Sequence, residues 1–123
     1  MEKIYTSNAP EAIGPYSQAV KVGNLVFTSG QIAINPSSGA VEATDIVGQT
    51  EQVCKNLCAV LEASGTSIDK AIKTTCFLSD MADFASFNEV YGKYFTGKPA
   101  RSCVAVKQLP KNVLCEVEVI AEL

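Results

Sequence analysis

The sequence predicts a single α+β domain in which two helices pack on one face of a mixed β-sheet. Strand-like segments at both ends of the chain enclose two segments with helical periodicity. The 123 residues have the length of one domain, and no linker rich in Pro, Gly or Ser divides residues 1–123. A strand–helix–strand crossover places its helix against one sheet face, so two helices cover one face only. The opposite face then needs another subunit.

The first part of the chain predicts a β-hairpin. Residues 17–22 and 25–32 are rich in β-formers, and Gly23-Asn24 between them is typical of a two-residue hairpin turn. A short strand over residues 4–6 is expected before the hairpin. The run Asn35-Pro36-Ser37-Ser38-Gly39 then forms a dense turn cluster.

A long helix is predicted from Thr44 or Asp45, either of which can cap it, to about residue 64. Gly65 supplies the stop. Residues of one face recur at steps of three and four, namely Ile46, Thr50, Val53, Leu57, Val60 and Leu61. This face must therefore pack against the rest of the protein.

The second half of the chain predicts a strand, a helix and two closing strands. Residues 71–79 are β-branched and aromatic, and a helix follows from about residue 83 to residue 95. The aromatic stripe of this helix, which we interpret as core rather than binding site, consists of Phe84, Phe87, Tyr91, Tyr94 and Phe95. Strands over residues 101–108 and 114–122 are joined by the turn Pro110-Lys111-Asn112.

The composition argues against several classes of function. The chain has no histidine, which removes Ser-His-Asp and Cys-His catalysis and His-ligated zinc. It contains neither of the common glycine-rich phosphate-binding motifs. A net charge of -3 argues against nucleic acid as the main partner, although weak RNA contact is left open.

The expected environment is the cytosol, with no membrane as partner. No apolar run approaches the ~20 residues of a membrane span, and the N-terminus begins no signal-like segment. A mitochondrion or related organelle is left open. The five cysteines are odd in number, form no C-x-x-C pair and lie in periodic apolar segments. We therefore expect reduced core thiols rather than disulfides or metal ligands.

Arg101 is the single arginine beside nine lysines, and it stands at the start of a predicted strand. A guanidinium grips a carboxylate through two parallel hydrogen bonds, whereas lysine is a point charge. An ordinary surface ion pair is the alternative. Strand alternation groups Arg101 with Cys103, and Glu116 with Glu118. We expect one apolar sheet face and one charged face holding these residues, with a merely solvated face as the alternative.

Ser29-Gly30 adds a hydroxyl beside a flexible backbone on a neighbouring strand. With no histidine or lysine base beside it in the motif, Ser29 is a poor nucleophile, and we assign it hydrogen bonding only.

Seven short motifs occur in a fixed order along the chain. They are Asn8-Ala9-Pro10, Ile13-Gly14-Pro15-Tyr16-Ser17-Gln18-Ala19, Thr28-Ser29-Gly30-Gln31, Lys73-Thr74-Thr75, Pro99-Ala100-Arg101-Ser102-Cys103, Leu109-Pro110 and Glu116-Val117-Glu118. Each alone is weak, but the ordered set resembles the RidA (YjgF) family over nearly the whole chain. The resemblance implies a chorismate-mutase-like α+β fold assembled as a homotrimer, with three sites in the clefts between neighbouring subunits.

The resemblance also implies a hydrolytic deaminase that needs no metal or organic cofactor. Its substrates would be 2-iminobutanoate and 2-iminopropanoate, released by pyridoxal-phosphate-dependent dehydratases that act on threonine or serine. Hydrolysis to 2-keto acids and ammonia would protect other enzymes from these reactive intermediates. The partners are thus small 2-imino and 2-keto carboxylic acids.

Carried over to this chain, the resemblance implies that Arg101 clamps the substrate carboxylate and that Glu116 orients or deprotonates the attacking water. Backbone groups near Gly30 and Cys103 would help to hold the ligand. The remaining pocket residues are Tyr16 and Ser29, with Asn88 as a further neighbour. Tyr16 has a simpler interpretation as an anchor of its own loop.

Two positions depart from the family pattern. The loop Thr96-Gly97-Lys98 looks short where the rim of the site should lie, and Cys115 replaces a branched aliphatic residue.

Two alternative functions are kept. One is a non-catalytic small-molecule-binding or chaperone-like module. The other is an endoribonuclease, which the lack of histidine and of any basic run disfavours.

Overall fold

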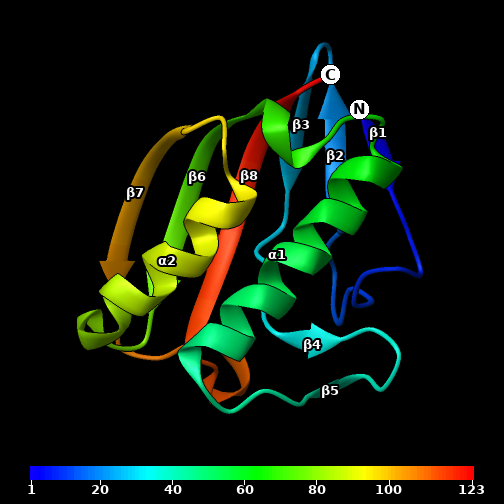
Figure 1. Cartoon of the computed structure of the whole chain (residues 1–123). Helices are drawn as coiled ribbons and strands as arrows, with labels where there is room; N and C mark the ends of the chain where they lie inside the picture. The colour runs from blue at the N-terminus through cyan, green and yellow to red at the C-terminus, as the bar shows by residue number, and fades with distance from the viewer.

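The protein is built on a six-stranded sheet with the strand order β1-β2-β3-β8-β6-β7 (Figure 1). The computed structural model describes all 123 residues. The strands are β1 (Glu2–Ile4), β2 (Ala19–Val22), β3 (Leu25–Thr28), β6 (Ala71–Leu78), β7 (Ala100–Ala105) and β8 (Cys115–Glu122). Only the β6–β7 pair is parallel, and the other pairs are antiparallel. The predicted mixed sheet is confirmed.

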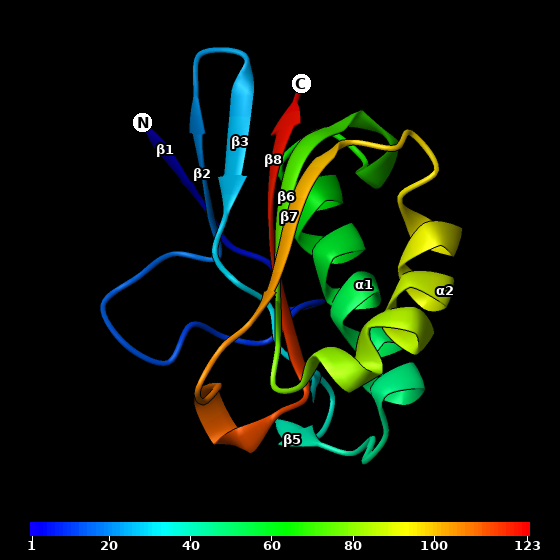
Figure 2. The ribbon, with the colours of Figure 1, turned by 90° about the vertical axis from the view of Figure 1, so that its left-hand side faces the viewer.

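Two helices, α1 (Ile46–Ala63) and α2 (Phe84–Tyr94), cover one face of this sheet and leave the other open, as Figure 2 shows edge-on. Asp45 caps α1, because its Oδ1 accepts the backbone N–H of Gly48 at 2.9 Å. Gly65 follows the last turn with φ of 89°, a conformation that favours glycine. Both predicted helices and their one-sided packing are confirmed.

The core lies between the sheet and the helices. The α1 stripe is fully buried at Val53, Leu57, Val60 and Leu61. In β8, Cys115, Val117, Val119 and Ala121 are buried, whereas the glutamates between them lie on the open face. The predicted alternation of this strand is therefore confirmed.

All five cysteines are unpaired, and Cys54, Cys76 and Cys115 are buried in this core. Burial raises the pKa of the Cys115 thiol to about 11, which leaves it protonated at neutral pH. Neither helix combines the length and the apolar composition that crossing a bilayer requires.

The strand predicted over residues 25–32 ends earlier, at Thr28, because of a bulge. Phe27 pairs with Ile120 and Gln31 with Val117, so the three residues 28–30 lie opposite the two residues 118–119. Ser29 and Gly30 leave the regular ladder within this interval. The turn cluster at residues 35–39 lies in a small hairpin of β4 (Ile34–Asn35) and β5 (Ala40–Val41).

The expectation that Arg101 and Glu116 share a charged face is wrong for one chain. Arg101 pairs in register with Thr74 and Cys103 with Cys76, which are buried towards the helices. Glu116 pairs with Phe77 on the open face. Alternation fixes which residues of a strand go together, but the pairing of β7 with β6 decides which face they occupy.

Candidate active site

A hollow on the open side of the sheet gathers four of the predicted site residues. We call it the glutamate hollow. It measures about 450 Å³ and is lined by Tyr16, Ser29, Gly30, Ile32, Pro110, Glu116 and Glu118. The lining comes from the loop before β2, the bulge after β3, the turn before β8 and β8 itself. These segments are distant in sequence, and the sheet brings them together.

Gly30 lets the Glu116 carboxyl group pack directly against the backbone. A Cβ built at Gly30 would collide with Oε2 of Glu116. Gly30 is not among the glycines with positive φ, so the requirement is one of space rather than of backbone conformation. No hydrogen bond within the chain uses the Gly30 N–H, which leaves this donor available to a ligand.

Ser29 and Tyr16 shape the wall of the glutamate hollow. Ser29 Oγ donates to the carbonyl of Ser17 at 2.5 Å, which ties the bulge to the loop before β2. The Tyr16 hydroxyl accepts the backbone N–H of Ile13 at 3.2 Å, while the residue as a whole is 51% exposed. Tyr16 therefore both anchors its loop, as the simpler interpretation has it, and lines the hollow.

The Glu116 carboxyl group has a raised pKa. Burial is the main cause, because removing water disfavours the charged form, and the neighbouring Glu118 carboxylate adds repulsion. A carboxylate whose pKa moves towards neutrality is a better general base than an exposed one. The hollow thus holds a candidate base beside a free backbone donor.

Arg101 lines a second hollow, at the other side of the sheet and next to α2. We call it the arginine hollow. It measures about 520 Å³ and is lined by Asn88, Tyr91, Gly92, Phe95, Thr96, Lys98, Pro99 and Arg101. Because β7 is the edge strand, this hollow opens at the border of the sheet.

The side chains of α2 hold the guanidinium of Arg101. Its Nη1 donates to Asn88 Oδ1 at 2.7 Å, and its central carbon lies 4.9 Å from the Tyr91 ring centroid and 5.5 Å from that of Phe84. No carboxylate of the chain pairs with it, since the one ion pair joins Lys21 to Glu2. The alternative of an ordinary surface ion pair within the chain is therefore wrong. The remaining donors are free to grip an anion.

Cys103 lies two residues beyond Arg101 on β7 and is half-buried. Burial raises the pKa of its thiol, although the nearby Arg101 charge opposes that change. A thiol in this state is a weak nucleophile. Cys103 is therefore a poor candidate for a nucleophile, and the part of its backbone in holding a ligand stays a prediction.

Six of the seven predicted site residues thus form two groups within one chain, and Cys103 lines neither hollow. Tyr16, Ser29, Gly30 and Glu116 meet in the glutamate hollow, whereas Asn88 and Arg101 meet in the arginine hollow. The sheet separates the two groups. A site that uses Arg101 together with Glu116 must therefore combine two chains.

Three residues that support the predicted site residues or their loops are not among those predicted from the sequence. Gln18 is buried, and its side chain bonds the backbone of Thr6 in both directions and the carbonyl of Pro10 at 2.8 Å. Phe84 and Tyr91 belong to the aromatic stripe predicted as core, but they also support the Arg101 guanidinium. Gln18 lies in one of the seven ordered motifs, but neighbouring residues do not show that a glutamine is buried.

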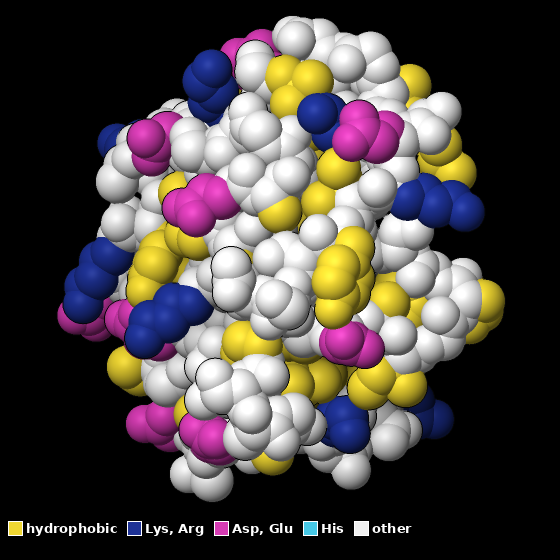
Figure 3. Space-filling model, turned by 90° about the vertical axis from the view of Figure 1, so that its right-hand side faces the viewer, with side chains coloured by type: hydrophobic (Ala, Val, Ile, Leu, Met, Phe, Trp, Pro, Cys, Tyr) yellow, Lys and Arg dark blue, Asp and Glu magenta, His cyan; other side chains and the backbone are white.

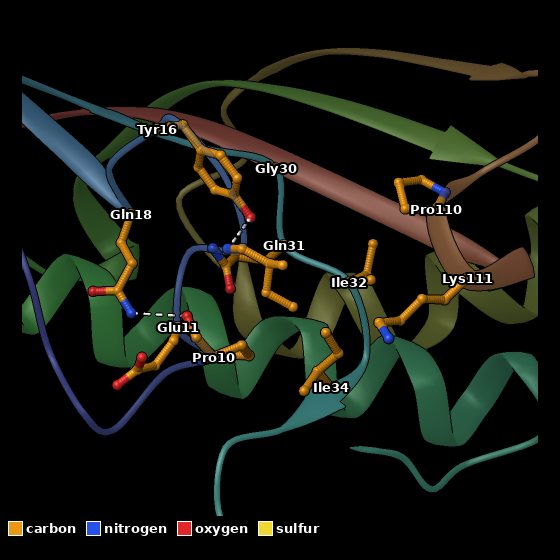
Figure 4. Close-up of a pocket in the computed structure, with 11 residues that line it drawn as sticks. Pro10, Glu11, Tyr16, Gln18, Gly30, Gln31, Ile32, Ile34, Pro110 and Lys111 are labelled. Atoms are coloured by element: carbon orange, nitrogen blue, oxygen red, sulfur yellow. Dashed lines mark hydrogen bonds between the residues drawn. The ribbon is translucent and has the colours of Figure 1, made fainter. Parts of the chain in front are cut away.

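Gln18 also borders a third hollow beside the glutamate hollow, of about 400 Å³ (Figure 4). The two hollows share Tyr16, Gly30, Ile32 and Pro110. In Figure 4 the Tyr16 hydroxyl, which accepts the hydrogen bond from the Ile13 N–H, lies on one side of this hollow, and the Lys111 side chain lies on the other. No group of three or more Cys, Asp or Glu side chains is arranged to hold a metal ion.

We expect Gly30→Ala to lower kcat/KM for the imine hydrolysis implied by the family resemblance by about 10-fold or more. The new methyl group displaces the Glu116 carboxyl group. The thermal midpoint should change little, since only the end of a flexible side chain must move. The measurement is kcat/KM of the variant alone and in a Glu116→Ala background. An equal loss in both backgrounds would contradict this mechanism.

The fold and the two hollows define a class: a small α+β chain with one hollow on its open sheet face and a second hollow around its lone arginine. Comparison with known proteins identifies the family to which such a chain belongs. The family model described as Endoribonuclease L-PSP matches residues 6–123. The chain therefore belongs to the RidA (YjgF) family.

Three relatives illustrate the match. A RutC family protein of Pyrococcus horikoshii is 54% identical, with 98% of this chain and 96% of that protein covered. The 2-iminobutanoate/2-iminopropanoate deaminase of Escherichia coli K12 is 48% identical, with 96% and 94% covered. The crystal structure of E. coli TdcF with bound serine has a TM-score of 0.95 at 44% identity, with 100% and 99% covered.

Proposed function

We propose that this chain is a hydrolytic deaminase of reactive 2-imino acids, assembled as a homotrimer with its sites between subunits. The observation that carries the proposal is the separation of Arg101 from Glu116 on opposite sides of the sheet. The relative named 2-iminobutanoate/2-iminopropanoate deaminase supports the reaction. The relative solved with serine supports a small amino-acid-like ligand.

The open face favours coverage by another copy of the chain. It carries half-exposed apolar side chains, with Phe27 at 37% and Val104 at 48% exposure. Burying such residues against an identical surface is favourable, and a small domain leaves much surface uncovered. In a ring of subunits the arginine hollow of one chain would face the glutamate hollow of the next.

In this arrangement Arg101 grips the substrate carboxylate, and Glu116 of the neighbouring subunit binds the attacking water. Water adds to C2 as its proton passes to Glu116 and the C=N electron pair moves to nitrogen. Glu116 then gives this proton to the nitrogen, the C–N bond breaks with its electron pair leaving on ammonia, and the hydroxyl proton passes to the Glu116 carboxylate, and from there to the departing ammonia or to solvent, as C=O forms. Imine and water give keto acid and ammonia. Orientation and one proton acceptor suffice, so no cofactor enters.

We expect Glu118→Gln to move the acid limb of the kcat/KM profile to lower pH. Glu116 must be ionised to accept a proton, and repulsion from Glu118 is one cause of its raised pKa. Removing that charge lowers the Glu116 pKa, so activity persists further into acid. The check is a pH profile of both proteins at fixed ionic strength. A limb that stays in place would contradict the assignment of Glu116 as the base.

The experiment that tests the proposal couples a threonine dehydratase to this protein and traps surviving imine with semicarbazide. Faster imine loss with the protein present would support the deaminase. If the amount of trapped imine is the same with and without the protein, and 2-oxobutanoate still binds, the non-catalytic binding module would be favoured. Light scattering at micromolar concentration tests the assembly, and the mass of a monomer would contradict it.

The ribonuclease alternative finds little support in the charge distribution. The chain is acidic overall, and on the face shown in Figure 3 basic and acidic side chains are interspersed without a continuous basic surface. Phosphate backbones are bound by clustered Lys and Arg. RNA cleavage that survived both further purification and Arg101→Ala would revive this alternative.

A further inference from the structure

The arginine hollow holds a second cation. Lys98 lines it together with Arg101, and no acidic residue belongs to its lining. Neither cation has a carboxylate partner in the chain, because the one ion pair joins Lys21 to Glu2. A protein of net charge -3 thus presents two unpaired positive groups in one hollow. A ligand with a single carboxylate bound to Arg101 would leave Lys98 without an ion-pair partner.

The backbone holds Lys98 in a fixed place at the rim. Its N–H donates to the carbonyl of Phe95 at 3.2 Å, and its φ is 53°. This left-handed conformation favours glycine or asparagine and is uncommon for lysine. A Cβ at the preceding Gly97 would lie 3.0 Å from the Asp69 carbonyl oxygen, so the loop is also tightly packed. The loop at residues 96–98 therefore fixes the backbone position from which the exposed Lys98 side chain extends.

The acidic residues near this loop do not neutralise it. Asp69 contacts the loop through its backbone carbonyl and makes no ion pair with Lys98. Glu89 follows Asn88 on α2 but is exposed and does not line the hollow. The charge of Lys98 is therefore available to a bound anion.

We propose that the site also accepts dicarboxylic 2-imino acids, of the 2-iminosuccinate and 2-iminoglutarate type. This inference rests on the proposed function, since it places the α-carboxylate on Arg101 and the second carboxylate near Lys98. The imine carbon keeps its position between the hollows, and water addition balances as for the smaller substrates. Such imines arise when an oxidase removes two electrons from an acidic amino acid.

The test compares turnover of two imines by wild type, Lys98→Gln and Lys93→Gln. Glutamate oxidase with catalase supplies 2-iminoglutarate, and threonine dehydratase supplies 2-iminobutanoate. Lys93 is an exposed lysine of α2 outside the hollow and serves as the matched control. Lys98→Gln should lower kcat/KM for 2-iminoglutarate about three- to fivefold more than kcat/KM for 2-iminobutanoate, the effect of one exposed ion pair, whereas Lys93→Gln should change neither value. Equal changes for both imines, or none, would overturn the inference.

A binding measurement separates this inference from the proposed function. Calorimetry with 2-oxoglutarate and 2-oxobutanoate requires no turnover. If the protein hydrolyses no imine but Lys98→Gln weakens 2-oxoglutarate binding alone, the deaminase fails and the dicarboxylate site stands. If imines are hydrolysed and neither readout depends on Lys98, the deaminase stands and the dicarboxylate site fails. The Lys98 effect should also shrink as salt is added.

Discussion

Replacing Arg101 with alanine is expected to lower kcat/KM for 2-iminobutanoate by about 100-fold or more. The guanidinium has no acidic partner in the chain, so its free donors are available to a substrate carboxylate. Losing a bidentate, charge-assisted pair removes about 3 kcal/mol or more of binding in the transition state. The measurement is imine hydrolysis followed by semicarbazide trapping.

Arg101→Lys should recover little of this activity, because an ammonium group cannot make two parallel bonds. The matched control is Lys107→Ala, an exposed cation six residues further along the chain, which should leave kcat/KM unchanged. Arg101 also packs on Tyr91 and Phe84, so thermal midpoints of all variants must be compared. Full activity in Arg101→Ala would remove Arg101 from the site.

Much of this fold could be predicted because its signals are local. The α1 stripe repeats over about four turns, and Asp45 and Gly65 mark its ends. The alternation of β8 is equally regular, so the separation of Val117 from Glu116 followed from period two alone. The end of β3 did not follow from any local pattern. The bulge after Thr28 depends on how β3 pairs with β8, 87 residues further along the chain at Cys115.

The sheet face that Arg101 occupies could not be predicted for the same reason, because it depends on pairing between strands that are distant in sequence. Its strand alternates Arg101 and Cys103 with Ser102 and Val104, and the valine favoured an outward arginine. The parallel pairing with β6 instead turns Arg101 towards α2. There, the Arg101 guanidinium lies near the rings of Tyr91 and Phe84 and donates to the amide oxygen of Asn88. These groups stabilise a cation that an aliphatic core would exclude. Local patterns therefore identified the chemical groups but not their arrangement.

Glu116→Gln is expected to lower kcat of imine hydrolysis by about 100-fold and to leave 2-oxobutanoate binding within about twofold. Glutamine keeps the shape that packs against Gly30 but cannot accept the proton of water. The measurements are kcat by imine trapping and affinity by calorimetry. Loss of binding with unchanged kcat would reverse the assigned role. No change in either quantity would place Glu116 outside the site.

Mixing the two inactive variants then tests whether the site joins two chains. In a ring of three, a junction works when Arg101 comes from a Glu116→Gln subunit and Glu116 from an Arg101→Ala subunit. Each mixed trimer contains one such junction, so random reassembly of equal amounts should restore about a quarter of the wild-type activity. A site within one chain would restore none. Because the sheet separates the two side chains in each subunit, recovered activity would require the glutamate hollow of one subunit to face the arginine hollow of the next.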